Sequence, residues 1–227
     1  LEGQAHSPWP PGRFAERLPL VRKWLSRTFR PDQRSLVKAT SFVSDIAGDL
    51  TGGTRRAVFL TLSPERYLQT ILAGEASRVE LAVLSGTRVE RLNRRLCADA
   101  IRLWELDEAQ RAAMAWACEM TALEAASGDH VLWLDFDAFL ADPAAKLAQA
   151  TAHLGIDLLG EQAEALVNGP IMRSYSKAPE HGYSPQLREE VLAAAAQERR
   201  AEIADALRWL EASANDHGAI ADALARA

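Results

Sequence analysis

Three short runs of apolar residues are spaced along the chain and predict β-strands. They cover residues 35–40, 56–62 and 130–135, and each is followed by polar or turn-forming residues. The runs are nearly continuous in apolar side chains, which is typical of parallel strands that are buried on both faces. We therefore expect an α/β fold, rich in helix, in which a parallel sheet is flanked by helices.

Helical periodicity occupies most of the remaining chain. Between residues 14 and 29, apolar side chains recur every three or four positions with Arg and Lys among them, which predicts an amphipathic surface helix. Further helices are predicted over residues 41–49, 64–74, 77–104, 108–126, 143–154 and 160–168, and from 184 onward. No internal repeat or low-complexity linker interrupts this order, so residues 1–227 are expected to form a single domain.

The composition of the 227 residues is that of an ordinary globular domain, with 48% hydrophobic and 25% charged residues. The formal net charge of -5 and the isoelectric point near 5.6 provide no basic field for nucleic acid or for an anionic membrane. We therefore expect neither as a partner, and any anion site must be a local cluster of basic side chains. The sequence has no run approaching the roughly 20 apolar residues of a membrane span.

The two cysteines, Cys97 and Cys118, lie within predicted helices. Neither belongs to a CxxC pair or stands at metal-ligand spacing from a histidine. We expect both to be small buried apolar groups in a reducing, cytoplasmic environment, with no metal bound.

The most specific segment directly follows the third predicted strand. Phe136–Pro143 reads Phe-Asp-Ala-Phe-Leu-Ala-Asp-Pro, and a Leu-Gly pair ends the next predicted helix at Gly155. Asp142 is expected to cap that helix, with Pro143 in its first turn. This block resembles the tyrosine-glutamate-x-leucine-x-x-aspartate-proline block of the sulfotransferases. The resemblance implies a sulfotransferase fold, which is similar to that of the P-loop hydrolases.

A second segment, Val58–Gly74, is similar to the sulfotransferase strand, loop and helix that hold the 3′-phosphate of the donor, 3′-phosphoadenosine 5′-phosphosulfate. In that family, an arginine two residues before a proline and a serine six residues after it contact the phosphate. The proline is kept, and Thr70 retains a hydroxyl at the serine position, whereas Leu62 replaces the arginine. Because a leucine cannot donate to phosphate, the charge is expected from Arg66 or Arg55.

The segment 36–40 is similar to the family's second strand, which ends in a lysine. In many members a catalytic histidine follows that lysine two residues later. Lys38 keeps the lysine, and the resemblance implies that it is the catalytic cation, which stabilises charge on the sulfuryl group during transfer. Thr40 occupies the histidine position and cannot act as a general base near neutral pH, so no base is assigned.

The polar loop at 169–183 holds Arg173 and Lys177 and corresponds in position to the loop that covers the nucleotide phosphates in sulfotransferases. The resemblance implies that both side chains bind the donor, while an ordinary solvated loop is the alternative. The family's glycine-rich phosphosulfate loop has no counterpart in the sequence. Since the chain begins at Leu1 in what reads as the middle of a domain, we expect that loop to lie upstream.

Two hypotheses about function follow from the resemblance. The first is a sulfotransferase that moves a sulfuryl group from 3′-phosphoadenosine 5′-phosphosulfate to a hydroxyl or amine of a small-molecule or carbohydrate acceptor. The second is a non-catalytic binding or assembly module on the same scaffold, which Leu62 and Thr40 motivate. Such a transfer depends more on positioning and charge stabilisation than on covalent catalysis, so we favour the enzyme.

Overall fold

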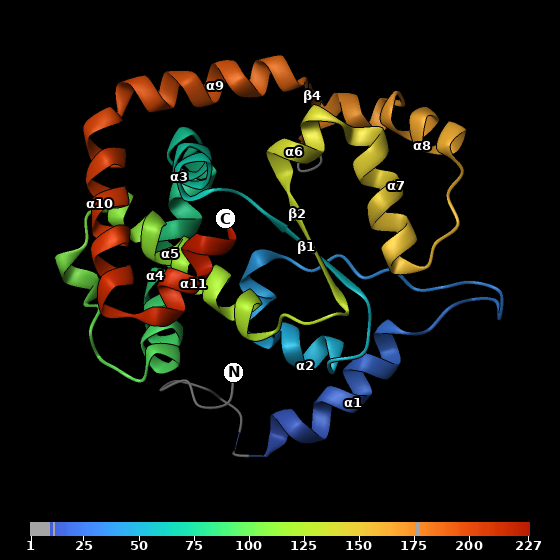
Figure 1. Ribbon diagram of the computed structural model, residues 1–227, viewed down its shortest axis with the longest axis horizontal. Coiled ribbons are helices and arrows are strands. Elements are labelled where there is room, and N and C mark those ends of the chain that lie inside the picture. Colours follow the sequence, from blue (N-terminus) through green and yellow to red (C-terminus); the bar gives the residue numbers. More distant parts are fainter. Residues whose placement is uncertain (1–9, 11, 176–177) are drawn as a thin grey trace.

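The computed structural model describes residues 10, 12–175 and 178–227, and most of them are helical (Figure 1). A pair of parallel strands stands in the middle of the molecule, and a second, antiparallel pair lies at its periphery. The coarse prediction of an α/β chain that is rich in helix is therefore confirmed.

The elements have the following bounds, where η denotes a 3-10 helix. The N-terminal half contains α1 (Arg13–Leu25), η1 (Ser41–Ile46), α2 (Ala47–Thr51), β1 (Ala57–Thr61), α3 (Pro64–Ala73), α4 (Glu75–Leu96), η2 (Leu103–Glu105) and α5 (Glu108–Ala125). The C-terminal half contains β2 (Val131–Asp135), α6 (Phe136–Ala141), α7 (Pro143–Leu154), α8 (Gly160–Val167), η3 (Pro170–Arg173), β3 (Ser174–Tyr175), β4 (Ala178–Gly182), α9 (Pro185–Glu198), α10 (Arg200–Asp216) and α11 (Gly218–Arg226). In Figure 1 the parallel strands lie between α3, α4, α5, α10 and α11 on one side and α6, α7 and α8 on the other.

The second and third predicted strands are present and pair with each other. β1 and β2 run parallel, in a register that joins Ala57 to Val131 and Thr61 to Asp135. Phe59 of β1 is buried and meets the Trp133 ring edge-on, with 5.3 Å between the ring centroids. The pair therefore has an apolar side, and its carboxyl ends finish at the same edge.

The first predicted strand is wrong. Residues 35–40 form exposed coil, and the structure pairs them with no other described strand. A strand is stable only when its backbone groups find a partner, and the apolar character of Leu36 and Val37 does not supply one. The parallel sheet of the described chain consequently has two strands rather than three.

The main hydrophobic core is built around α5. This helix begins with a reciprocal capping box between Asp107 and Gln110, with N–H to oxygen distances of 2.8 and 3.1 Å. Its many alanines allow α4 and α10 to pack closely on it, while Met114 and Trp116 fill the larger spaces. The core continues through α3 and α11, so it is chiefly a helix-on-helix core rather than one formed on a sheet.

The passage from β2 into the following helices occurs as predicted, with one addition. Asp142 accepts a hydrogen bond from the Ala145 N–H at 3.2 Å and caps α7, which ends at Gly155 with a φ of 68°. An extra short helix, α6, stands between the strand and this cap. Asp135 caps α6 by accepting from the Ala138 N–H at 2.7 Å.

The long helix predicted over 77–104 is too long, and one cysteine is misplaced. α4 ends at Leu96 because the next residue, Cys97, has a φ of 53°, a left-handed conformation that stops the helix; Cys97 is exposed rather than buried. Cys118 is buried as expected, and burial raises the pKa of its thiol to about 12. It is therefore an inert core group.

The helices at both ends of the chain also differ from the prediction. The first ends at Leu25 rather than at residue 29, and the segment that begins at Ser41 is a 3-10 helix before α2. The continuous helix predicted from 184 onward is divided into α9, α10 and α11. None of the described helices combines the length and the apolar character that crossing a bilayer requires.

Candidate functional site

The carboxyl ends of β1 and β2 place two helix starts side by side. Thr61 and Asp135 are the last paired residues; α6 begins directly after Asp135, and α3 begins at Pro64, after two intervening residues. In open parallel sheets, ligands bind outside this edge of the strands. Functional side chains are therefore expected at the carboxyl edge of β1 and β2.

Arg66, near the start of α3, is the central cation at this edge. Its Nε donates to Oδ2 of Asp137 at 2.8 Å, and its Nη2 donates to Glu189. A third hydrogen bond, 3.2 Å long, joins its Nη1 to Oε1 of Gln69. With 23% of its side chain exposed, Arg66 is held firmly yet remains accessible to solvent.

A second arginine, Arg188 at the start of α9, approaches the same carboxylate. Its Nη1 lies 2.8 Å from Oδ1 of Asp137, so the two arginines share the two oxygens of one carboxyl group. The Arg188 guanidinium also lies over the Phe136 ring, 5.2 Å from its centroid. Only 10% of the Arg188 side chain is exposed, and within the part of the chain that the structure describes its buried Nη2 has no hydrogen-bond partner.

We call Arg66, Asp137, Arg188 and Glu189 the edge cluster. Its two positive and two negative charges balance. Burial lowers the pKa of Arg66, but the hydrogen bonds to Asp137 and Glu189 outweigh this effect and raise it. Arg66 therefore stays protonated, and an incoming anion must compete with the carboxylates for it.

The structure describes four of the five predicted site residues, and of these it brings together Arg66 and Thr70. Thr70 lies one turn after Arg66 on α3 and donates its hydroxyl proton to the Arg66 carbonyl oxygen at 2.7 Å. Lys38 lies in the exposed coil before η1 and has no hydrogen bond or ion pair with the edge cluster. The predicted catalytic position is thus not joined to the predicted phosphate site.

The remaining two predicted residues belong to the loop before α9. The Arg173 side chain is exposed, and its backbone carbonyl accepts from the Tyr183 N–H at 2.9 Å, which closes the β3–β4 ribbon. Lys177 lies outside the described residues. Arg55, the alternative source of charge, is exposed beyond α2.

Sequence reasoning missed Arg188, although it found Arg66. Arg188 lies on a predicted helix far along the chain, and it reaches Asp137 only because α9 crosses α3 and approaches α6 (Figure 1). The available signal was its position next to the predicted helix start at Ser184-Pro185, directly after the polar loop at 169–183. At Leu62 the backbone carbonyl accepts from the Trp116 indole N–H at 2.9 Å, and the side chain offers no cation.

A second arginine–carboxylate cluster was also missed, and it lies in the interior. Arg88, Arg91 and Arg95 stand about one turn apart on α4 and face Glu119 of α5 and Asp45 of η1; we call these five residues the buried network. Arg88 Nε donates to Glu119 at 3.0 Å, and Arg95 Nη2 donates to Asp45 at 2.5 Å. The Arg91 guanidinium lies 4.0 Å from the centroid of the Phe42 ring.

The Arg88–Glu119 pair of the buried network is closed to solvent. The Arg88 and Glu119 side chains are 3% and 7% exposed, and Ser44 also donates to Glu119. Burial raises the pKa of Glu119, and the hydrogen bonds from Ser44 and Arg88 offset only part of this effect. The network joins η1 to α4 and α5, which is a structural role.

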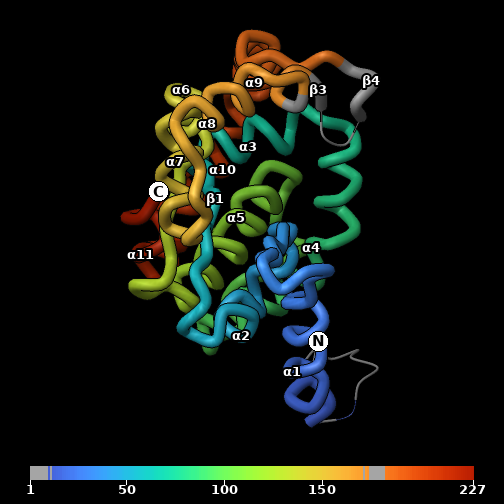
Figure 2. The backbone as a smooth tube through the Cα atoms, turned by 90° about the vertical axis from the view of Figure 1, so that its right-hand side faces the viewer, coloured from blue at the N-terminus to red at the C-terminus, as the bar shows by residue number. Residues whose placement is uncertain are grey.

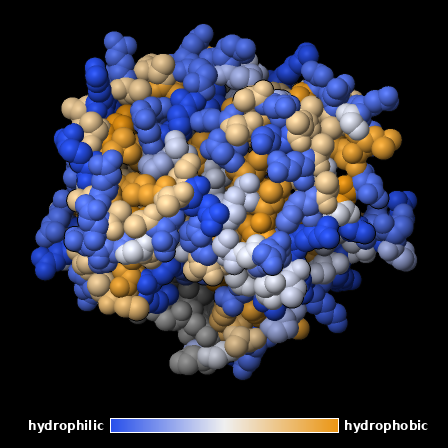
Figure 3. Space-filling model, in the orientation of Figure 1, coloured by the Kyte–Doolittle hydropathy of each residue, from blue (hydrophilic) through white to orange (hydrophobic). Residues whose placement is uncertain are grey.

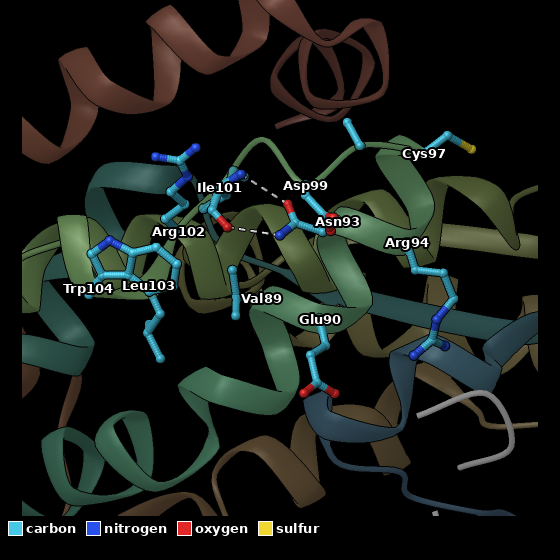
Figure 4. Close-up of a pocket in the computed structure, with 11 residues that line it drawn as sticks. Val89, Glu90, Asn93, Arg94, Cys97, Asp99, Ile101, Arg102, Leu103 and Trp104 are labelled. Atoms are coloured by element: carbon cyan, nitrogen blue, oxygen red, sulfur yellow. Dashed lines mark hydrogen bonds between the residues drawn. The ribbon is translucent and has the colours of Figure 1, made fainter. Parts of the chain in front are cut away.

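A groove of about 770 Å³ lies elsewhere, between the end of α4 and η2 (Figure 4). Asn93 shapes it by exchanging two hydrogen bonds with the Ile101 backbone, at 2.8 and 3.1 Å. The ionisable residues that line it carry two charges of each sign: Glu90, Arg94, Asp99 and Arg102. It contains none of the predicted site residues and no excess of positive charge, so it does not match a phosphate-bearing donor.

Comparison with known proteins does not identify the chain. No family model matches it, and no curated protein or solved structure matches it. Among the described residues, no three His, Cys, Asp or Glu side chains come together in a way that would bind a metal ion. The chain is thus an α/β protein whose most developed accessible polar site is the edge cluster.

Proposed function

We propose that this chain is a sulfotransferase that binds the 3′-phosphate of 3′-phosphoadenosine 5′-phosphosulfate at the edge cluster. The observation that supports the proposal is the convergence of Arg66 and Arg188 at the carboxyl edge of two parallel strands. The resemblance to sulfotransferases implies that the 3′-phosphate of the donor binds at that edge. Arginine pairs are well suited to it because each guanidinium presents several N–H donors to phosphate oxygens.

In this proposal the carboxylates keep the arginines in place until the nucleotide binds. Glu189 is mostly exposed, so phosphate can replace it on Arg66 at little cost in desolvation. The buried Arg188 Nη2 has no hydrogen-bond partner among the described residues, so a phosphate that reaches it gains a donor without breaking an existing bond. Asp137 remains between the two guanidinium groups and fixes their orientation.

The transfer itself moves one sulfuryl group. The acceptor oxygen or nitrogen bonds to sulfur while the bond from sulfur to the bridging phosphate oxygen breaks, and adenosine 3′,5′-bisphosphate leaves. The acceptor proton passes to solvent or to a base. We propose Lys38 as the cation that stabilises the charge on the transferred group, which requires the exposed coil of residues 35–40 to approach the donor.

Isothermal titration with adenosine 3′,5′-bisphosphate tests the proposed site. The chain is expected to bind this product, and Arg66→Gln is expected to weaken binding about 10- to 100-fold because one charge-assisted contact is lost. The matched control is Arg208→Gln, which removes an exposed arginine that pairs with Asp205 on α10. Absence of binding at millimolar ligand, or equal loss in both variants, would overturn the proposal.

A non-catalytic binding module is the second candidate, and Leu62 is the observation that favours it. A chain of this kind keeps the scaffold but lacks the cation that the family places before the proline. In this case the Leu62→Arg variant is expected to gain nucleotide binding, while the unmodified chain has neither binding nor turnover of labelled 3′-phosphoadenosine 5′-phosphosulfate. Measured sulfuryl transfer by the unmodified chain excludes the module.

A further inference from the structure

Charge is distributed unevenly along the chain. Residues 13–38, which we call the basic segment, carry eight Lys or Arg and two Asp or Glu, a net charge of +6. The whole chain has a formal charge of -5, so the rest of it carries -11. The basic segment is therefore opposite in sign to the remainder of the molecule.

The basic segment also exposes large apolar side chains. Trp24 and Leu20 lie one turn apart on α1 and are 76% and 54% exposed, and Phe29, beyond the helix, is completely exposed. Leu36 and Val37 continue this exposure along the coil. Large apolar side chains are seldom this exposed, and several of them within one segment indicate a surface that binds a protein or a membrane.

The two kinds of side chain share one face of α1. Arg13, Arg17, Leu20 and Trp24 follow one another at intervals of three or four residues, and all but Arg13 are mainly exposed. Figure 2 shows α1 at the end of the molecule opposite α9, and Figure 3 shows hydrophobic atoms among hydrophilic ones at the same edge. The basic and apolar side chains on this face of α1 can therefore contact the same flat surface of a binding partner.

We propose that the basic segment binds the surface of an anionic phospholipid membrane, with Trp24, Leu20 and Phe29 inserted at the level of the headgroups. Interfacial segments combine Trp, Phe and Leu with Lys and Arg in this way, because the apolar groups enter the bilayer boundary while the cations contact lipid phosphates. The segment lies on the surface and does not cross the membrane.

The charge and the apolar groups together favour lipid over the other occupants. A duplex nucleic acid would pair its phosphates with the arginines, but its bases are stacked inside, so it offers no apolar surface to Leu20 or Leu36. A second copy of the chain offers acidic surface, yet the segment consists of one short helix and exposed coil rather than a preformed groove. The sequence-based expectation of no membrane partner rested on the net charge of the whole chain, which hides the opposite sign of residues 13–38.

Sedimentation with lipid vesicles tests this inference. The chain is expected to sediment with vesicles of phosphatidylcholine containing about one third phosphatidylserine, and not with phosphatidylcholine alone. Each cation near such a surface strengthens binding about fivefold, so the double variant Arg17→Gln/Lys23→Gln should bind roughly 25-fold more weakly. Added salt should weaken binding of the unmodified chain in the same direction.

A second variant and its matched control test the insertion of apolar side chains into the membrane. The double variant Leu20→Ser/Trp24→Ser is expected to weaken vesicle binding about tenfold or more, because two inserted apolar side chains are removed. Val83→Ser removes an equally exposed apolar residue on α4 and should leave binding unchanged. All substituted side chains are exposed, and circular dichroism verifies that each variant is folded.

Three results would overturn the inference. The first is equal sedimentation with neutral and anionic vesicles. The second is tight binding of duplex nucleic acid that Leu20→Ser/Trp24→Ser leaves intact, which would assign the cations to nucleic acid. The third is a dimer in sedimentation velocity that the same variant dissociates, without vesicle binding by the monomer, which would assign the face to a second copy.

Discussion

The edge cluster and the buried network are built from the same chemistry but lie in different surroundings. In the edge cluster, two arginines share the Asp137 carboxylate, and water reaches both Arg66 and Glu189. In the buried network, Arg88 and Glu119 are almost completely enclosed by α4, α5 and η1. Arginine–carboxylate contacts alone therefore do not indicate function.

Burial decides what each cluster can do. A closed pair has already lost its hydration, so removal of one partner leaves a charge that nothing else can satisfy. An accessible pair can exchange one partner for water or for a ligand at a modest cost. The buried network is thus expected to determine stability, and the edge cluster is expected to determine binding.

The largest effect is expected for Arg88→Met. This variant leaves Glu119 without its ion-pair partner in the interior and should reduce the free energy of unfolding by about 3–5 kcal/mol, as measured by urea denaturation. The matched control is Arg102→Met, which removes the exposed pair with Glu105 and should change stability by about 0.5 kcal/mol or less. If the two variants lose similar stability, the network does not have the structural role assigned to it.

A second test uses the titration of Glu119. Its pKa is raised in the folded state by burial, so the stability that this group contributes is greatest below the pKa of the unfolded chain and is lost as pH rises through the folded value. The Glu119→Gln side chain cannot titrate. The stability of this variant relative to the unmodified protein should therefore increase in denaturant titrations as pH rises from below to above the ordinary titration range of a glutamate carboxyl. A difference that is constant with pH, or that falls, would contradict the raised pKa.

The same contrast explains how much of the molecule could be predicted. Helix starts at Pro64, Pro143 and Pro185 were predicted correctly, because a capping side chain and its N–H donor lie three residues apart. The strand at 35–40 was wrong because pairing depends on a partner elsewhere in the chain. Sequence patterns therefore describe local elements better than their assembly.

The two clusters were predictable to different degrees for the same reason. Arg66 was identified through its place after a strand and a proline. Arg188 was not identified, because its approach to Asp137 depends on the path of α9 across α3. The buried network had only a weak signal, namely three arginines about one turn apart on a long helix and a glutamate among alanines.

Arg66→Gln provides the counterpart to Arg88→Met. Asp137 keeps its ion pair with Arg188, and Glu189 is solvated, so this variant should lose only about 1 kcal/mol or less of stability. Thermal denaturation of the two variants side by side measures the difference. A loss as large as that of Arg88→Met would show that the edge cluster is a structural clamp and would remove the reason to regard it as a binding site.

The smallest change in stability is expected for Glu189→Gln. This variant should strengthen nucleotide binding, whereas Arg66→Gln should weaken it. Glu189 accepts from Arg66 on an exposed surface, so the variant should change the free energy of unfolding by about 0.5 kcal/mol or less. Removing one negative charge beside Arg66 should strengthen binding of adenosine 3′,5′-bisphosphate about fivefold in titration calorimetry, and added salt should reduce this gain. The matched control is Glu190→Gln, which removes the neighbouring charge on α9. If Glu190→Gln strengthens nucleotide binding equally, the gain comes from the loss of any negative charge on α9 and not from the contact of Glu189 with Arg66. If Glu189→Gln weakens binding, Glu189 supports the site instead of competing with the ligand for Arg66.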